Sequence, residues 1–147
     1  LGKNYNCERA ALLGLYHDMT EIITGDMPTP VKYHSDDMRE AFKEVEDKAG
    51  KKLLSMLPDD MAKYYESAFF KQEGEEYLWK IVKAADKLSA LIKCIEEKNA
   101  GNNEFGKALE STRAATENMN MPEVRVFLDE FLPSFYLSLD EQNESSF

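Results

Sequence analysis

The stretch LYHDMTEIITGDMPTPVK, which covers residues 15–32, combines a histidine, three carboxylates and a loop with two prolines. In an α-helix, residues three and four positions apart lie on one face. His17, Asp18 and Glu21 would therefore share a face, and their side chains suit a divalent cation and the proton of its bound water. After Gly25, the prolines restrict the backbone, so we expect a stiff loop.

Apolar residues recur at a spacing close to 3.6 along most of the chain, which is the period of an amphipathic helix. Asn6, Ser35 and Asn102 or Asn103 are suitable N-caps, and Pro122 suits a first helical turn. Helices are expected over residues 6–25, 35–57, 59–69, 77–99, 103–118 and 121–139, the last with a kink at Pro133. No segment has the alternating pattern of a strand. The sequence therefore predicts an all-α fold, a bundle of about six helices.

A length of 147 residues is most simply that of one domain. We expect this domain over residues 1–141 and a frayed tail over residues 142–147. The chain begins Leu1-Gly2-Lys3, without a methionine, and enters a helix almost at once, which is typical of the interior of a longer protein. The domain is therefore expected to be incomplete at its N-terminus.

The chain is acidic, with 28 aspartates and glutamates against 18 lysines and arginines and a formal net charge of −10. Nucleic-acid binding needs clustered cations along the phosphates, so the composition argues against a DNA or RNA polymer as a partner. A small anionic ligand is compatible with it when a bound cation reverses the local field. No apolar run reaches the length of a membrane span and no segment resembles a cleavable signal. We therefore expect a soluble, cytoplasmic protein that does not bind membranes.

The residues His17 and Asp18 have two interpretations. Histidines beside acids are common on helices, where they form surface ion pairs or interact with the helix dipole. However, the pair lies between the apolar run Leu12–Tyr16 and Met19, so we expect it within a buried stripe, where ionisable groups need partners that a metal ion supplies. Glu21 follows one turn later. It is either a solvated helix acid or a general base close to the reacting water.

The loop after the first helix also has two interpretations. Asp26 belongs to a Gly-Asp pair, which is ordinary in turns. Alternatively, Asp26 and Thr29 contact a hydroxyl group of a substrate, because a loop stiffened by prolines loses little entropy on binding. Neither alternative is excluded by the residues alone.

Asp86 is the remaining candidate, in the helix expected over residues 77–99. Its neighbours Ala84 and Ala85 are small and allow another helix or an ion to approach closely. Asp86 either pairs with Lys83, one turn back, or binds a metal together with the His-Asp pair.

Four segments of the chain resemble those of one protein family. They read YHDMTEIITGDMPTPVKY (residues 16–33), VKAADKLSALIKCIEE (82–97), AGNNEF (100–105) and FLPSFYLSLDE (131–141). A His-Asp pair followed by an aspartate on a later helix resembles the HD-domain metal-dependent phosphohydrolases. The four segments together look like the bacterial 5′-deoxynucleotidases of the YfbR type, and they span nearly the whole chain.

The resemblance implies an HD-domain helical bundle that is a homodimer and hydrolyses deoxyribonucleoside 5′-monophosphates to deoxynucleoside and phosphate. It implies that His17, Asp18 and Asp86 are metal ligands, with cobalt or manganese as the divalent cation and a further histidine ligand upstream of Leu1. Glu21 would act catalytically near the attacking water. The residues that the resemblance assigns to substrate binding are Asp18, Asp26, Met27, Pro28, Thr29 and Asp86.

One feature of the family is missing from this sequence. Family members carry a first histidine ligand, and an Arg-Trp pair that contacts the nucleotide, upstream of the His-Asp helix. His34 follows the proline loop and does not match that position, so the chain as it stands is expected to bind metal weakly and to have weak activity. Two other functions stay open: another HD phosphohydrolase, acting on a nucleoside triphosphate or an alarmone, and a non-catalytic helical dimer that retains only the fold.

Overall fold

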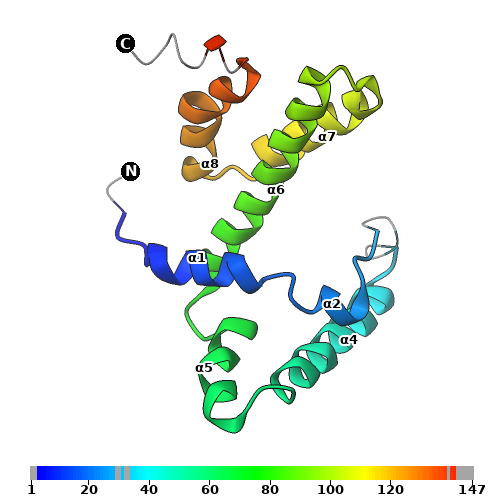
Figure 1. The fold of residues 1–147 in the computed structure, drawn as a ribbon, viewed down its shortest axis with the longest axis vertical. Coiled ribbons are helices and arrows are strands. Elements are labelled where there is room, and N and C mark those ends of the chain that lie inside the picture. The colour runs from blue at the N-terminus through cyan, green and yellow to red at the C-terminus, as the bar shows by residue number, and fades with distance from the viewer. Residues whose placement is uncertain (1–2, 29–30, 32–33, 139, 142–147) are drawn as a thin grey trace. The chain divides into compact units, whose positions relative to one another are not determined.

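Every regular element of the described chain is helical (Figure 1). The computed structural model describes residues 3–28, 31, 34–138 and 140–141. Its α-helices are α1 (Cys7–Tyr16), α2 (Glu21–Thr24), α4 (Asp36–Leu54), α5 (Asp59–Phe69), α6 (Glu76–Asn99), α7 (Gly106–Glu117) and α8 (Pro122–Val126). Shorter elements are the 3-10 helix η1 (Asn103–Phe105), the π-helix η2 (Phe127–Phe131) and the 3-10 helix η3 (Leu132–Tyr136). No strand occurs among the residues described, which confirms the predicted all-α fold.

The chain divides into two compact units. The N-terminal unit is Asn6–Trp79, and the C-terminal unit comprises the described residues of Leu1–Tyr5 and Lys80–Phe147. Helix α6 begins in the N-terminal unit and continues without a break into the C-terminal unit. The single domain expected over residues 1–141 stays a prediction, and the tail expected over residues 142–147 lies outside the described residues.

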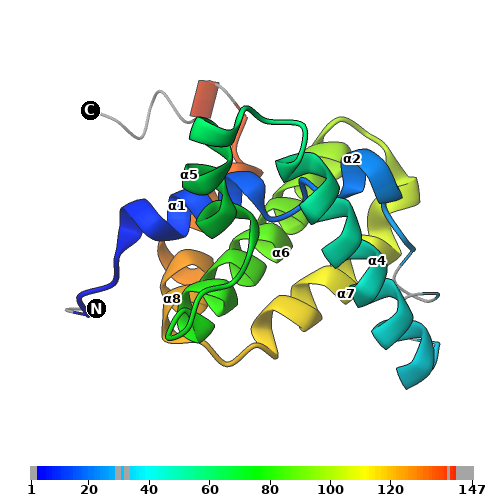
Figure 2. The same cartoon turned by 90° about the horizontal axis from the view of Figure 1, so that it is seen from below.

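In the N-terminal unit, α5 packs against α1 and α4, and α4 also contacts α2 (Figure 2). The buried apolar side chains of this unit are Leu13, Phe42, Ala49 and Ala68. Close packing is possible at Gly50 on α4, where a Cβ atom would lie 3.1 Å from the ring of Phe70. Tyr16 attaches the end of α1 to α5, because its ring centroid lies 5.8 Å from that of Tyr65 and 5.6 Å from that of Phe69.

Three predicted helix starts are confirmed by side-chain caps. Oδ1 of Asn6 accepts a hydrogen bond from the backbone N–H of Arg9 at 2.9 Å. Oγ of Ser35 accepts one from the N–H three residues further on, at 3.1 Å. Oδ1 of Asn102 accepts from the N–H of Glu104 at 3.2 Å, at the start of η1. The first N–H groups of a helix have no partner within it, which is why a short polar side chain is favoured at each of these positions.

The predicted continuous helix over residues 6–25 is wrong. Helix α1 ends at Tyr16, α2 begins at Glu21, and residues 17–20 form a turn between them. The N–H of Met19 bonds the carbonyl of Tyr16 at 3.1 Å, and the N–H of Glu21 bonds that of Asp18 at 2.9 Å. These bonds span three residues instead of four, so the chain tightens as in a 3-10 helix. Apolar spacing does not distinguish the two patterns over so few residues.

The C-terminal unit has its core where α6, α7 and η3 meet. The buried residues of this core are Leu91, Cys94, Ile95, Leu109 and Leu132. After α8, the chain changes to the π-helix η2 and then to the 3-10 helix η3, whose first turn contains Pro133. Proline lacks the N–H that continues a helical ladder, so the change of helix type at Pro133 agrees with the kink expected there. Among the described residues, no helix is both long and apolar enough to cross a lipid bilayer.

Candidate metal site

The residues His17 and Asp18 follow directly after α1, where the last carbonyl groups of the helix point onward. His17 is the C-cap residue and keeps helical backbone angles, with φ −61° and ψ −30°. The carbonyl end of a helix carries partial negative charge, which favours a cation nearby. Partial burial beside Tyr65 raises the pKa of Tyr16 above its usual value, so the phenol that precedes the pair stays neutral.

The imidazole of His17 has a polar neighbour at each ring nitrogen. Nδ1 lies 2.7 Å from the carbonyl oxygen of Gly14, and Nε2 lies 2.9 Å from Oδ2 of Asp18. A carbonyl oxygen only accepts hydrogen bonds, so Nδ1 carries a proton. In the neutral ring, Nε2 then carries the lone pair, and Oδ2 of Asp18 lies 2.9 Å from this atom.

The short distance between Nε2 of His17 and the carboxylate of Asp18 indicates that this pair can bind a positive charge. At 2.9 Å, the unprotonated Nε2 and the carboxylate oxygen, both carrying partial negative charge, repel each other unless a positive charge acts between them or the ring gains a second proton. A second proton makes an imidazolium–carboxylate ion pair, whereas a divalent cation makes both atoms its ligands. Metal-binding histidines commonly donate their other N–H to a backbone carbonyl, as His17 does to Gly14. The donor set of this pair therefore fits a divalent cation.

The prediction that this pair lies within a buried stripe is wrong for Asp18, whereas the side chain of His17 is 26% exposed and its Nε2 atom is buried. The side chain of Asp18 is 55% exposed, and Leu15 in the preceding turn is 73% exposed. Within α1, full burial is found at Leu13. Burial therefore does not demand a cation at Asp18, and the fit to a metal rests on the geometry of the imidazole and the carboxylate.

Glu21 is the first residue of α2, and its side chain is half-buried. It follows the His-Asp pair by one turn, as expected, but it starts a new helix instead of continuing the same one. The hydrogen bond from its N–H to the carbonyl of Asp18 keeps the two backbones adjacent. A role for Glu21 in moving a proton stays a prediction.

The loop after α2 is described in part. Gly25 ends α2 with φ +69°, a value that glycine adopts without strain. Asp26 and Pro28 are exposed and Met27 is half-buried, while Thr29 lies outside the described residues. Contacts from these four positions to a substrate stay a prediction.

Asp86 lies on α6 in the C-terminal unit, with an exposed side chain. The helix predicted over residues 77–99 is confirmed, since α6 spans Glu76–Asn99. Because His17 and Asp18 belong to the other unit, the role of Asp86 as a third ligand stays a prediction.

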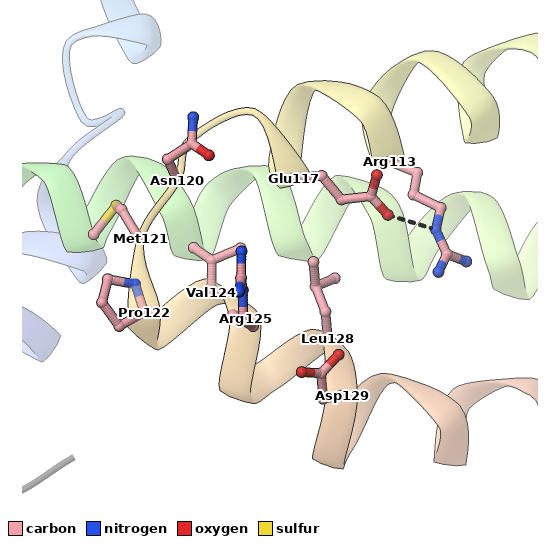
Figure 3. A pocket seen from close by; sticks show the side chains of 9 residues that line it. All are labelled: Arg113, Glu117, Asn120, Met121, Pro122, Val124, Arg125, Leu128 and Asp129. Atoms are coloured by element: carbon pink, nitrogen blue, oxygen red, sulfur yellow. Dashed lines mark hydrogen bonds and ion pairs between the residues drawn. The ribbon is translucent and has the colours of Figure 1, made fainter.

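The C-terminal unit contains a cavity of about 390 Å³ where α7 is linked to α8 (Figure 3). Its lining residues are Arg113, Glu117, Asn120, Met121, Pro122, Val124, Arg125, Leu128 and Asp129. Nε of Arg113 donates to Oε1 of Glu117 at 3.0 Å, and this bond raises the pKa of Arg113. None of the predicted site residues lines this cavity. Its acids offset its arginines, so the charges of its wall do not favour a nucleotide.

The helical elements of the described chain, with a histidine–aspartate pair directly after a helix, are consistent with an HD-type helical domain. Comparison of the sequence with known families narrows this class. The sequence model of the 5′-deoxynucleotidases described as YfbR-like matches residues 1–135, and the chain belongs to this family.

Individual relatives agree with this assignment. A 5′-deoxynucleotidase of Vibrio vulnificus is 43% identical over 140 residues, which are 95% of this chain and 72% of the relative. One of Photobacterium profundum is 44% identical over 138 residues, or 94% of this chain and 71% of the relative. The 5′-deoxynucleotidase YfbR of Salmonella paratyphi B is 42% identical over 145 residues, or 99% of this chain and 73% of the relative. The resemblance noted from the sequence is thereby confirmed.

Proposed function

We propose that this protein is a metal-dependent phosphomonoesterase that hydrolyses deoxyribonucleoside 5′-monophosphates to deoxynucleoside and phosphate. Membership of the YfbR-like family supports the proposal, as does the activity for which relatives at 42–44% identity are named. The structural observation that carries it is the pairing of His17 Nε2 with Asp18 Oδ2, with Nδ1 held by the Gly14 carbonyl.

The proposed metal ligands are His17, Asp18 and Asp86, one imidazole and two carboxylates. This mixture suits ions of intermediate softness, and cobalt and manganese are the metals that we propose. When bound, such a cation polarises the phosphate and lowers the pKa of a water molecule. Support for the ligand set comes from the donor chemistry of the His17–Asp18 pair and from the matching family segments.

The proposed reaction is the attack of water on phosphorus, with breakage of the bond to the 5′ oxygen of the sugar. Glu21 accepts a proton from the attacking water, a role that needs a carboxylate within hydrogen-bond reach of that water. The leaving 5′ oxygen gains the proton that Glu21 has accepted and departs as the hydroxyl group of the deoxynucleoside, which returns Glu21 to its ionised form. Atoms balance without any further reactant.

Substrate contacts are proposed for two groups of residues. Asp18 and Asp86 lie next to the phosphate through their part in the metal site. The loop of Asp26, Met27, Pro28 and Thr29 contacts the sugar, and its prolines reduce the entropy lost when it binds. We further propose a homodimer in the cytoplasm, with a small nucleotide as substrate and neither a nucleic-acid polymer nor a membrane as partner.

Phosphate release tests the activity. The gene product that carries this chain is stripped of metal and assayed with deoxyribonucleoside 5′-monophosphates, with and without added Mn²⁺ or Co²⁺. We expect phosphate release that depends on the metal. Release no greater than in the metal-free control rejects the proposal. Release of pyrophosphate from a triphosphate or an alarmone, without monophosphate hydrolysis, assigns another HD phosphohydrolase.

Variants test the ligand set. His17→Ala and Asp86→Asn are expected to lower both activity and bound metal to the metal-free level. The matched controls are His34→Ala, which removes the other of the two histidines, and Glu96→Gln, which removes another exposed acid of α6. Equal metal content in Asp86→Asn and Glu96→Gln would remove Asp86 from the site.

A further inference from the structure

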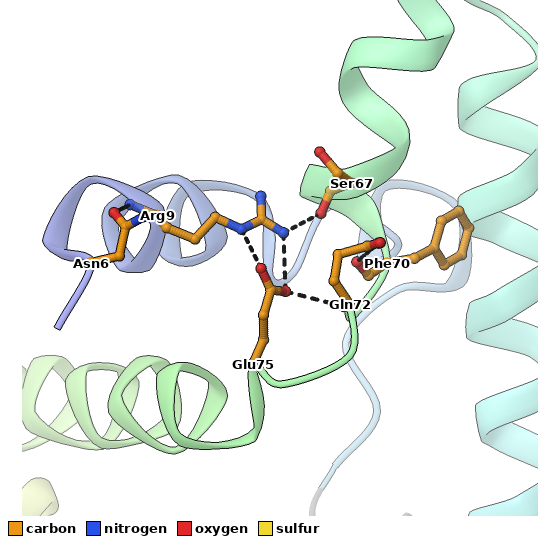
Figure 4. Close-up of polar contacts among 6 residues, drawn as sticks. All are labelled: Asn6, Arg9, Ser67, Phe70, Gln72 and Glu75. Carbon is orange, nitrogen blue, oxygen red and sulfur yellow. Dashed lines mark hydrogen bonds and ion pairs between the residues drawn. The ribbon is translucent and has the colours of Figure 1, made fainter.

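Arg9 on α1 forms a cluster of polar contacts that the sequence did not indicate (Figure 4). Its Nε donates to Oε1 of Glu75 at 2.6 Å, and its Nη2 donates to Oε2 of the same residue at 3.0 Å. Nη2 also donates to the backbone carbonyl of Ser67, near the end of α5, at 2.6 Å. A guanidinium held by two parallel bonds to one carboxylate has a fixed orientation, since both groups are planar.

Glu75 occupies the position directly before α6. Its own carbonyl accepts the first bond of that helix, from the N–H of Trp79 at 3.0 Å. Its carboxylate also accepts from the backbone N–H of Gln72 at 3.1 Å, which closes the turn between α5 and α6. The carboxylate thus fixes both the turn that leads into α6 and the guanidinium on α1.

This pair is mostly shielded from water. The side chains of Arg9 and Glu75 are 15% and 14% exposed. Hydrogen bonding from Arg9 lowers the pKa of Glu75, and the carboxylate raises the pKa of Arg9, so both groups are ionised at neutral pH. A charged pair with little exposure is costly to break, because each group alone lacks solvation.

The two anchored segments lead to the proposed metal ligands. Helix α1 runs from Arg9 to Tyr16 and ends directly before His17. Helix α6 starts directly after Glu75 and carries Asp86 further along the same continuous helix. Ligands that come from two helices need those helices to start in a fixed relation, since shifts of about 1 Å at a catalytic site cost about 100-fold in rate.

We propose that Arg9 and Glu75 are positioning residues for the metal site, which set the relation between α1 and the first turn of α6. The inference rests on the proposed function and on the fork between the guanidinium and the carboxylate. A positioning role differs from a purely stabilising one, because loss of a positioning residue changes metal affinity in a protein that is still folded.

The test compares metal affinity with stability in the full gene product. Arg9→Ala, Arg9→Lys and Glu75→Gln are titrated with Mn²⁺ alone by calorimetry, at a temperature where thermal unfolding shows each variant to be folded. Loss of a residue that orients a metal ligand typically weakens metal binding about 10- to 100-fold. Arg9 acts on the helix that leads to His17 and not on a ligand directly, and we expect a loss within this range for Arg9→Ala, with a matching fall in kcat. Arg9→Lys keeps the charge but lacks the fork, so we expect an intermediate loss. Glu75→Gln keeps the shape of the side chain, so it provides the same test of the pair if Arg9→Ala does not fold.

The matched control is Arg39→Ala, which removes an exposed arginine paired with Asp36 in the same unit. We expect its Mn²⁺ affinity to equal that of the wild type within twofold. A double variant, Arg9→Glu with Glu75→Arg, exchanges the two charges, and we expect it to restore part of the affinity lost in the single variants. Folded variants of Arg9 and Glu75 with wild-type Mn²⁺ affinity and kcat overturn the inference and leave the proposed function intact. A wild-type protein that neither binds Mn²⁺ nor hydrolyses the monophosphates overturns both.

Discussion

Two arginine–glutamate pairs among the described residues lie in different surroundings. Arg9 and Glu75 are 66 residues apart in sequence, with an Nε–Oε1 distance of 2.6 Å and side chains that are 15% and 14% exposed. Arg113 and Glu117 lie one turn apart on α7, with a distance of 3.0 Å and side chains that are 49% and 52% exposed. The first pair lies in the N-terminal unit and the second in the C-terminal unit.

The comparison shows that surroundings, and not residue types, decide what an ion pair does. Water solvates Arg113 and Glu117 with or without each other, so their attraction is screened and side-chain entropy opposes it. The guanidinium of Arg9 is also held by the carbonyl of Ser67, and Glu75 by the N–H of Gln72, so breaking that pair leaves shielded polar groups without partners. Four variants test this difference, from the largest expected effect to the smallest.

Arg9→Ala is expected to reduce the free energy of unfolding most. Removing one partner of a shielded pair leaves an uncompensated carboxylate, which costs roughly 3 kcal/mol. Urea unfolding followed by circular dichroism measures the loss. A loss under about 1 kcal/mol would place this pair in the same class as an exposed one.

Glu75→Gln removes the charge of the carboxylate, and we expect its effect on the free energy of unfolding to depend on pH. The Arg9 guanidinium lowers the pKa of Glu75 in the folded protein, below the value of about 4.3 in the unfolded chain. The carboxylate therefore stabilises the fold fully above that pH, and this contribution is lost as the pH falls through the folded pKa. We expect the variant to be less stable by about 2 kcal/mol at neutral pH. The difference between wild type and variant should shrink in unfolding curves taken toward pH 3, and a constant difference would contradict the assignment.

Asn6→Ala is expected to have a smaller effect on the same helix as Arg9. It removes the cap whose Oδ1 accepts from the N–H of Arg9, and the loss of an N-cap costs about 1 kcal/mol. Thermal unfolding compares it with Asn6→Ser, which retains a capping oxygen and should be close to wild type. Equal losses in both variants would show that the cap is not the cause.

Arg113→Ala is expected to change stability least. Exposed pairs one helical turn apart contribute about 0.3–0.5 kcal/mol, and salt screens them. Urea unfolding should give a small difference from wild type at low ionic strength and a still smaller one at high ionic strength. A loss as large as that of Arg9→Ala would remove the distinction between the two pairs.

Local signals in the sequence predicted much of the fold. Asn6, Ser35 and Asn102 act as caps because the first N–H groups of a helix need acceptors, and this requirement is visible from residue types alone. The helix α6 and the change at Pro133 followed from apolar spacing and from the missing N–H of proline. These features depend on neighbours within one or two helical turns.

Other features depend on contacts that no local pattern specifies. The break between Tyr16 and Glu21 contains neither glycine nor proline, so apolar spacing carried the predicted helix through it. His17 and Asp18 were recognised because they are adjacent, and the bond from His17 to Gly14 spans only three residues. The partnership of Arg9 with Glu75 arises from the packing of α1 on α5, which brings together residues far apart in sequence.

The hydrogen bond between Nδ1 of His17 and the Gly14 carbonyl makes the ring a spectroscopic reporter. With the proton retained at Nδ1, nitrogen-15 resonances of the imidazole distinguish a protonated nitrogen from a bare one. A diamagnetic ion such as zinc would displace the resonance of Nε2 while the Nδ1 proton persists. Occupancy of the site could then be followed at a single labelled side chain, without any substrate present.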